Sequence, residues 1–265
     1  MNVIRRVLAF LKPMNISLHG AYTSFFLALS VFPVLVILFG VLGYTAFGVE
    51  ELLDLVAGFL PEALLPMVER LLLGAYEHTS GAVVSVSAVA ALWSASRGVR
   101  GLLMGLNAVY GLEENRSYFL TRTISVVYTF LFVIVLVLTL VLHVFGTTIL
   151  DYLRMTTNPL LQFLMEVIDL RFVLLLILQT ALFTAMYAVL PNRNNSLKES
   201  LPGALLTSFG WLTFSDLFSI YVEHFQKYAN IFGSVYAVAL AMLWLYWCIC
   251  IVFYGAALNR WLMER

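Results

Sequence analysis

One acidic side chain lies inside a long apolar stretch of this sequence, and its neighbours make it a candidate ion or proton site. Asp216 lies three residues after Thr213 and three before Ser219, so the three polar groups share one face of a predicted helix. A charge in the middle of a membrane helix costs about 2.5–3.5 kcal/mol on insertion scales. We therefore expect a protonatable or cation-binding group open to water; the alternative is a hydrogen-bonded clasp between helices.

Three residues from other apolar stretches are predicted to lie at a similar depth. At a rise of about 1.5 Å per residue, the level of Asp216 is close to those of Gln179, Thr180 and His143. Together these side chains predict one polar pathway for a substrate or an ion.

Two arginines form a second candidate site. Arg97 and Arg100 lie three residues apart near the end of another apolar stretch, with Asn107 on nearly the same side of the continued helix. The planar donors of arginine suit paired phosphate oxygens, so this group could bind an anionic lipid headgroup or a substrate phosphate. The alternative is a pair of basic anchors that set the membrane topology.

Apolar segments long enough to cross a membrane must position these residues. The chain has 265 residues, of which 62% are hydrophobic and 11% charged, whereas about a quarter are charged in soluble domains. A spanning helix needs roughly 20 apolar residues. The sequence predicts an all-α integral membrane protein, a single polytopic domain over 1–265, with six transmembrane helices: Ala21–Thr45, Ala82–Gly101, Arg122–Thr147, Arg171–Leu190, Gly203–Val222 and Ser234–Leu258.

Basic residues are unevenly distributed between the two sides of these spans, and this predicts the orientation. Basic residues in short loops favour the cytoplasm, so both termini are predicted to be cytoplasmic. Residues 1–18 predict an interfacial N-terminal helix, and the long outer loops 49–80 and 148–170 predict short amphipathic interfacial helices. Of the 15 Lys and Arg, 11 lie on the predicted inner side: Arg5, Arg6, Lys12, Arg97, Arg100, Arg116, Arg122, Arg193, Lys198, Arg260 and Arg265.

Proline and glycine mark positions of special geometry. Pro33, in the middle of the first span, removes a backbone donor and predicts a kink that could act as a hinge. Gly101 and Gly105 permit close helix packing, either within the chain or in a homo-oligomer.

The sequence offers no pattern typical of an enzyme, a metal centre or a nucleic-acid interface. No GxxxxGK[ST] run is present, and the loops are too short for a large basic patch. We therefore expect no catalytic residue, metal, cofactor or nucleic-acid partner, and membrane lipids as partners. The histidines are scattered singly, and the two cysteines share one span without facing each other: His19, His78, His143, His224, Cys248 and Cys250.

Several segments, taken in order, resemble the YihY/BrkB family of bacterial inner-membrane proteins over nearly the whole chain. The resemblance implies a multi-pass protein of the bacterial cytoplasmic membrane; the family was once labelled a tRNA-processing ribonuclease, which these residues do not support. Phe232 and Ala257 depart from the family, which commonly has Tyr and an acid there. The matching residues are Ala21–Thr23, Leu29–Pro33, Leu92–Ser96, Leu106–Tyr110, Arg116, Leu201–Ala204, Trp211, Phe218, Tyr221, Gly233, Ser234, Trp244–Tyr246, Gly255, Ala256, Leu258 and Asn259.

The function expected from these features is transport. A kinked helix, an acid inside a span and an acidic outer side favour a transporter or exporter of a small or amphipathic, lipid-like solute that is not driven by ATP. The alternative is a non-transporting scaffold or envelope-assembly factor that binds lipids or partner proteins.

Overall fold

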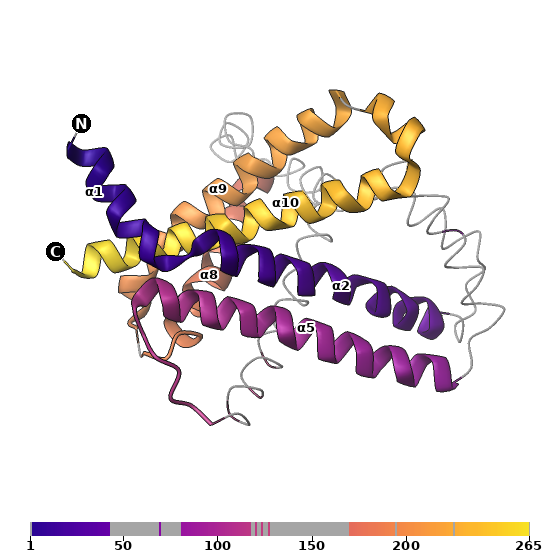
Figure 1. The fold of residues 1–265 in the computed structure, drawn as a ribbon, viewed down its shortest axis with the longest axis horizontal. Coiled ribbons are helices and arrows are strands. Elements are labelled where there is room, and N and C mark those ends of the chain that lie inside the picture. The colour runs from indigo at the N-terminus through magenta and orange to yellow at the C-terminus, as the bar shows by residue number, and fades with distance from the viewer. Residues whose placement is uncertain are drawn as a thin grey trace, which may run out of the picture. The chain divides into compact units, whose positions relative to one another are not determined.

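The regular elements of the structure are all helices (Figure 1). The computed structural model describes residues 2–42, 69, 81–117, 120, 123, 127, 170–193, 195–224 and 226–264. Within these residues the prediction of an all-α protein is confirmed. The elements are α1 (Asn2–Leu11), a 3-10 turn (Lys12–Met14), α2 (Ile16–Leu42), α5 (Gly81–Tyr110), α8 (Leu170–Val189), α9 (Leu197–His224) and α10 (Gln226–Met263).

Five of the predicted spans fall on these helices, in chain order on α2, α5, α8, α9 and α10. Three of the helices contain a stretch long and apolar enough to cross a membrane: Phe172–Val189, Leu197–Val222 and Val238–Met263. The span predicted at Arg122–Thr147 and the outer segments 49–80 and 148–170 lie almost entirely outside the described residues. The count of six spans and the inward termini therefore stay predictions.

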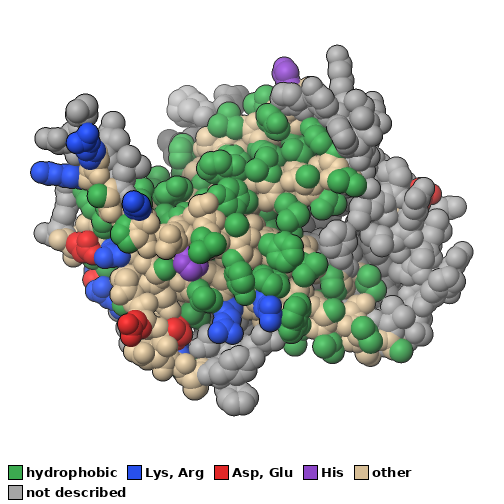
Figure 2. Space-filling model, in the orientation of Figure 1, with side chains coloured by type: hydrophobic (Ala, Val, Ile, Leu, Met, Phe, Trp, Pro, Cys, Tyr) green, Lys and Arg blue, Asp and Glu red, His purple; other side chains and the backbone are tan. Residues whose placement is uncertain are grey.

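Hydrophobic side chains cover much of the described surface in Figure 2, as a lipid-facing surface requires. Exposed members include Val86 and Val89 on α5, Phe209 on α9 and Val235 on α10. This distribution is the structural counterpart of the high hydrophobic content of the sequence.

The N-terminal segment predicted as an interfacial helix is divided in two. Helix α1 ends at Leu11, and a 3-10 turn containing Pro13 leads to Asn15. Asn15 adopts the left-handed conformation, with φ of 46°, which asparagine tolerates better than most residues. Helix α2 then begins at Ile16 and continues through Pro33 without a break. The role of Pro33 as a hinge stays a prediction.

Contacts divide the chain into two compact units, which are described separately. Unit 1 comprises Met1–Ser17, Leu103–Phe214 and Cys250–Arg265, and unit 2 comprises Leu18–Leu102 and Ser215–Ile249. Helices α5, α9 and α10 each contribute residues to both units.

In unit 1, two glycines allow the backbones of α9 and α10 to approach closely. A Cβ added to Gly255 would lie 2.6 Å from the carbonyl oxygen of Gly203 and 2.7 Å from the phenol oxygen of Tyr187, and would also collide with the hydroxyl of Thr207. A Cβ on Gly203 would collide with the carbonyl oxygen of Gly255. Small residues permit this kind of close helix contact in membranes.

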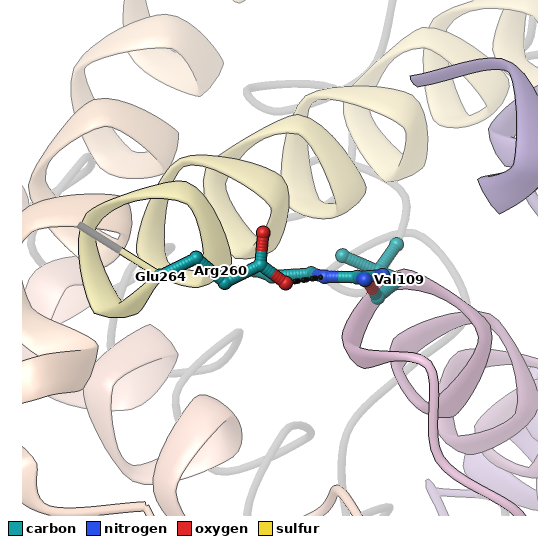
Figure 3. Close-up of polar contacts among 3 residues, drawn as sticks. All are labelled: Val109, Arg260 and Glu264. Atoms are coloured by element: carbon teal, nitrogen blue, oxygen red, sulfur yellow. Dashed lines mark hydrogen bonds and ion pairs between the residues drawn. The ribbon is translucent and has the colours of Figure 1, made fainter. Parts of the chain in front are cut away.

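Backbone and side-chain hydrogen bonds cap the C-terminal end of α5, which lies in unit 1. Gly111, with φ of 68°, places the Leu112 N–H 2.8 Å from the Asn107 carbonyl and the Gly111 N–H 3.2 Å from the Ala108 carbonyl, which is a Schellman ending. The Arg260 guanidinium donates to the Val109 carbonyl at 2.7 Å (Figure 3). Arg260 also forms an ion pair with Glu264 at 2.7 Å, so the last turn of α10 is tied to the end of α5.

In unit 2, α2 and α5 lie side by side (Figure 1) and touch at small residues. A Cβ on Gly98 would lie 2.6 Å from the Leu27 side chain, and one on Gly101 would lie 2.5 Å from the Thr23 hydroxyl oxygen. Gly101 therefore serves helix packing within the chain, as one of the two expected alternatives proposed.

The glycine contact of α9 and α10 predicts a position-specific stability loss. Because the nearest atoms are backbone oxygens and a buried hydroxyl, Gly203→Ala and Gly255→Ala should each lower the free energy of unfolding by about 1–3 kcal/mol. Thermal unfolding of the purified protein in detergent measures this. Gly210→Ala is the matched control on α9, because its Cβ would meet only the Ile251 side chain, at 3.1 Å. Equal stability of Gly203→Ala and Gly210→Ala would contradict the close backbone contact.

Candidate functional site

A carboxamide joins two loops in unit 1. The Asn107 side chain, which is buried, donates to the Glu114 carboxylate at 2.8 Å and accepts the backbone N–H of Asn192 at 2.8 Å. The Asn192 side chain donates in turn to the Glu113 carbonyl at 2.7 Å. We call Asn107, Glu114, Asn192 and Arg116 the loop network.

Arg116 completes the loop network at the end of α8. Its guanidinium donates to the carbonyl of Leu190 at 3.1 Å and to the carbonyl of Pro191. These carbonyls follow the last turn of α8, where a positive charge is favourable. The loop after α5 is therefore attached to the loop after α8.

A second carboxamide joins α9 and α10. Asn259 is completely buried; its Oδ1 accepts the Gly203 N–H at 2.6 Å, and its Nδ2 donates to the Ser200 carbonyl at 3.0 Å. Burial raises the pKa of the Tyr110 phenol to about 12. The contact holds the start of α9 against the end of α10.

The start of α9 is also fixed locally by a capping box. The Glu199 N–H donates to the Ser196 hydroxyl at 3.2 Å, and the Ser196 N–H donates to the Glu199 carboxylate at 3.0 Å. Two backbone donors that a helix start leaves unpaired are thereby satisfied.

A tyrosine joins α8, α9 and α10 at one buried point. The Tyr187 phenol of α8 donates to the Val252 carbonyl of α10 at 2.6 Å, and its oxygen lies 2.6 Å from the Thr207 hydroxyl of α9. Because the phenol has only one proton, Thr207 is the donor in the second bond. The Asn195 amide also donates to the Tyr187 carbonyl at 2.9 Å. We call Tyr187, Thr207 and Val252 the tyrosine junction.

One turn away along α8, buried polar groups are not paired. Gln179, Thr180 and Thr184 are 7%, 7% and 8% exposed, yet the Gln179 carbonyl oxygen and both threonine hydroxyls find no hydrogen-bond partner in the described part of the chain. Thr180, Thr184 and Tyr187 follow i, i+4, i+7 spacing and share one helix face. We call Gln179, Thr180 and Thr184 the α8 stripe.

The predicted pathway residues are distributed over both units. Gln179 and Thr180 are buried in unit 1, and Thr213, also in unit 1, is half-buried on α9. Asp216 and Ser219 are exposed on the part of α9 that belongs to unit 2. His143 lies outside the described residues. Of the predicted pathway residues, Gln179 and Thr180 belong to the α8 stripe.

The predicted headgroup residues are also separated. Arg97 and Arg100 are exposed on the part of α5 in unit 2, whereas Asn107 has its carboxamide engaged in the loop network of unit 1. Among the residues that the structure describes, no group of three His, Cys, Asp or Glu side chains could hold a metal ion.

The sequence interpretation missed Thr184, Tyr187, Thr207 and Asn259 as site residues. The spacing of Thr180, Thr184 and Tyr187 within an otherwise apolar span was the available signal for the first two. Asn259 and Gly203 were noted only as parts of matching segments, since their contact spans 56 residues of sequence.

Comparison with known proteins identifies relatives but no structural template. The chain is 29% identical over 246 residues to a protein of Bacillus subtilis named "putative ribonuclease-like protein YfkH", covering 93% of this chain and 90% of that protein. It is 30% identical over 89 residues to a "UPF0761 membrane protein" of Photobacterium profundum and 37% identical over 83 residues to one of Azotobacter vinelandii; these matches cover 34% and 31% of this chain and 28% and 20% of those proteins. No solved structure matches.

A family model described as "Virulence factor BrkB" matches residues 10–265. This match covers nearly the whole chain, and two of the relatives above are named as membrane proteins. The chain therefore belongs to the BrkB family of membrane proteins, as the resemblance of its segments predicted.

Proposed function

We propose that this protein moves a small or amphipathic solute, lipid-like solutes included, across the bacterial cytoplasmic membrane without ATP hydrolysis. The distribution of Lys and Arg supports an orientation with both termini in the cytoplasm. The observation that supports transport best is the α8 stripe, a set of unpaired polar groups buried in a helix that is apolar enough to span a membrane.

Unpaired polar atoms at this position need a solvent or a ligand. A buried donor or acceptor left without a partner costs about 1–3 kcal/mol, and almost all buried polar groups in folded proteins are paired. Gln179 to Thr184 extend over about 7.5 Å of helix axis. Ordered water molecules or polar groups of a solute would supply the missing hydrogen bonds of these groups.

The tyrosine junction supports a closed end to this pathway. At Tyr187 every polar side chain that joins α8 to α9 and α10 has a partner, and Tyr187 and Thr207 are completely buried. A stretch of unpaired polar groups, the α8 stripe, followed by a stretch of paired and buried ones, the tyrosine junction, is the arrangement expected of a gated pathway. The α8 stripe carries no charge, so it suits the hydroxyl, amide or ester groups of a solute.

Asp216 is proposed as the coupling group. It lies within the candidate span Leu197–Val222 and its side chain is exposed, with Thr213 and Ser219 on the same face of α9. An acid at this depth is costly unless water or a cation reaches it. A proton or cation that binds there would couple movement of the solute to the gradient of that ion.

A non-transporting scaffold is the second candidate function. The specific observation in its favour is that α9 exposes many large apolar side chains, which fit lipid, a partner protein or a second copy of the chain. They are Leu201, Leu205, Leu206, Phe209, Leu217, Ile220 and Tyr221.

The first prediction from this proposal separates transport from stability. Thr184→Val should leave the free energy of unfolding unchanged or raise it by up to about 1–3 kcal/mol, because valine removes a buried hydroxyl that has no partner in the described part of the chain. The substitution should nevertheless slow flux about five- to tenfold. The reason is that the loss of one hydrogen bond worth about 1–1.4 kcal/mol raises the barrier to transport by that amount. Fluorescently labelled phospholipid crossing vesicles that contain the purified protein, read out by dithionite bleaching, measures the flux.

Thr207→Val is the matched control. Its hydroxyl bonds to Tyr187, so this variant should lose about 1 kcal/mol of stability. If the unmodified protein moves no labelled lipid in these vesicles, the scaffold function is favoured. If Thr184→Val is destabilised as much as Thr207→Val, the Thr184 hydroxyl forms a structural hydrogen bond.

The second prediction concerns ion coupling. Flux through the unmodified protein should respond to an imposed pH or sodium gradient. Asp216→Asn should abolish that response, because an uncharged amide does not take up a proton near neutral pH and does not replace a carboxylate as a cation ligand. Glu113→Gln, which removes an exposed loop acid, is the matched control and should keep the response. If Asp216→Asn retains it, Asp216 is not the coupling group.

A further inference from the structure

An exposed arginine and an open apolar groove lie end to end on the part of α5 that belongs to unit 2. The groove is lined by Ser85, Val86, Val89, Ala90 and Trp93, and Arg97 follows one turn after Trp93. We propose that this surface binds one anionic phospholipid, with its phosphate on Arg97 and an acyl chain in the groove. The proposal goes beyond the transport function and does not rest on the α8 stripe.

Two aromatic rings hold the guanidinium of Arg97 in place. Its central carbon lies 4.4 Å from the centre of the Trp93 ring and 5.3 Å from that of Phe26, and the two rings meet edge to face at 6.2 Å. Cation–π contact uses the face of the guanidinium and leaves its N–H edges free to donate. No carboxylate in the described part of the chain pairs with Arg97.

The position of Arg97 favours a lipid phosphate as its anion. Arg97 lies inside the predicted span Ala82–Gly101, about 6 Å from its end. Its side chain turns back toward Trp93, as helical side chains turn toward the N-terminus of their helix. An unpaired guanidinium at this depth is costly, and the phosphates of anionic lipids are the anions available at the cytoplasmic interface. Arg100, also exposed, lies one turn nearer the interface and can donate to the same headgroup.

The groove suits the apolar part of such a ligand. Val86 and Val89 are each 70% exposed, and the groove has a volume of about 520 Å³. From Ser85 to Trp93 it extends over about 12 Å of helix axis, away from the end of the span near which Arg97 lies. Charge at one end and an apolar channel along the rest match the two parts of a phospholipid.

Quenching of Trp93 by brominated lipid tests the proposal. The full chain is reconstituted in phosphatidylcholine vesicles that contain a small fraction of acyl-brominated phosphatidylglycerol or acyl-brominated phosphatidylcholine. The Trp93 signal is the emission of the unmodified protein minus that of Trp93→Phe. We expect brominated phosphatidylglycerol to reach the same quenching of Trp93 at about one fifth of the concentration that brominated phosphatidylcholine needs. This preference is the one that a single arginine near the membrane surface confers.

Two substitutions separate the headgroup from the groove. Arg97→Gln should abolish the preference for phosphatidylglycerol, whereas Arg193→Gln, which removes an exposed loop arginine, should keep it. Ala90→Phe fills the groove and should lower quenching by both lipids. Circular dichroism confirms that each variant remains helical.

Three results would overturn the proposal. They are equal quenching by both brominated lipids in the unmodified protein, a preference for phosphatidylglycerol that survives Arg97→Gln, and relief of the quenching by millimolar inorganic phosphate, which would indicate a site for free phosphate.

Discussion

The contact of α9 with α10 through Gly203, Gly255 and Asn259 is the constraint on which unit 1 depends. Pro202 and Gly203 are poor residues for the interior of a helix, yet here glycine allows the backbones to meet, and the Asn259 carboxamide takes over the Gly203 N–H. Only at this separation can the Tyr187 phenol reach both Thr207 on α9 and the Val252 carbonyl on α10. The stability of this end of the unit therefore comes from the buried hydrogen bonds of Asn259 and Tyr187 as well as from apolar packing.

Within one turn of α8, the buried polar groups change from paired to unpaired. At Tyr187 the polar groups of α8 are paired, whereas at Thr184, Thr180 and Gln179 they are buried and unpaired in the described part of the chain. A membrane offers no water to such groups unless the protein admits it. This contrast between a satisfied and an unsatisfied section of one spanning helix is the physical basis of the proposed pathway.

The helices were predictable from the sequence because long apolar runs in a lipid solvent have few alternatives to a helix. The predicted span Ala82–Gly101 is nevertheless shorter than the observed α5, which continues to Tyr110 and is followed by Gly111. Helical spacing placed Asn107 beside Arg97 and Arg100, but its carboxamide bonds to Glu114 and Asn192. These hydrogen bonds depend on where the loops that carry Glu114 and Asn192 lie, which helical periodicity cannot reveal. Thr184 could have been predicted as a site residue, since it shares a helix face with the predicted Thr180.

Access of water to the α8 stripe is the central claim, and cysteine labelling tests it most directly. In a background in which Cys248 and Cys250 are replaced by alanine, Thr180→Cys and Thr184→Cys proteins in vesicles would be exposed to a charged, membrane-impermeant methanethiosulfonate reagent. Leu175→Cys is the control, because Leu175 is buried to the same degree on the same helix. Both threonine positions should react with the reagent, and the Leu175 position should not. Threonine positions as unreactive as Leu175 would contradict the claim.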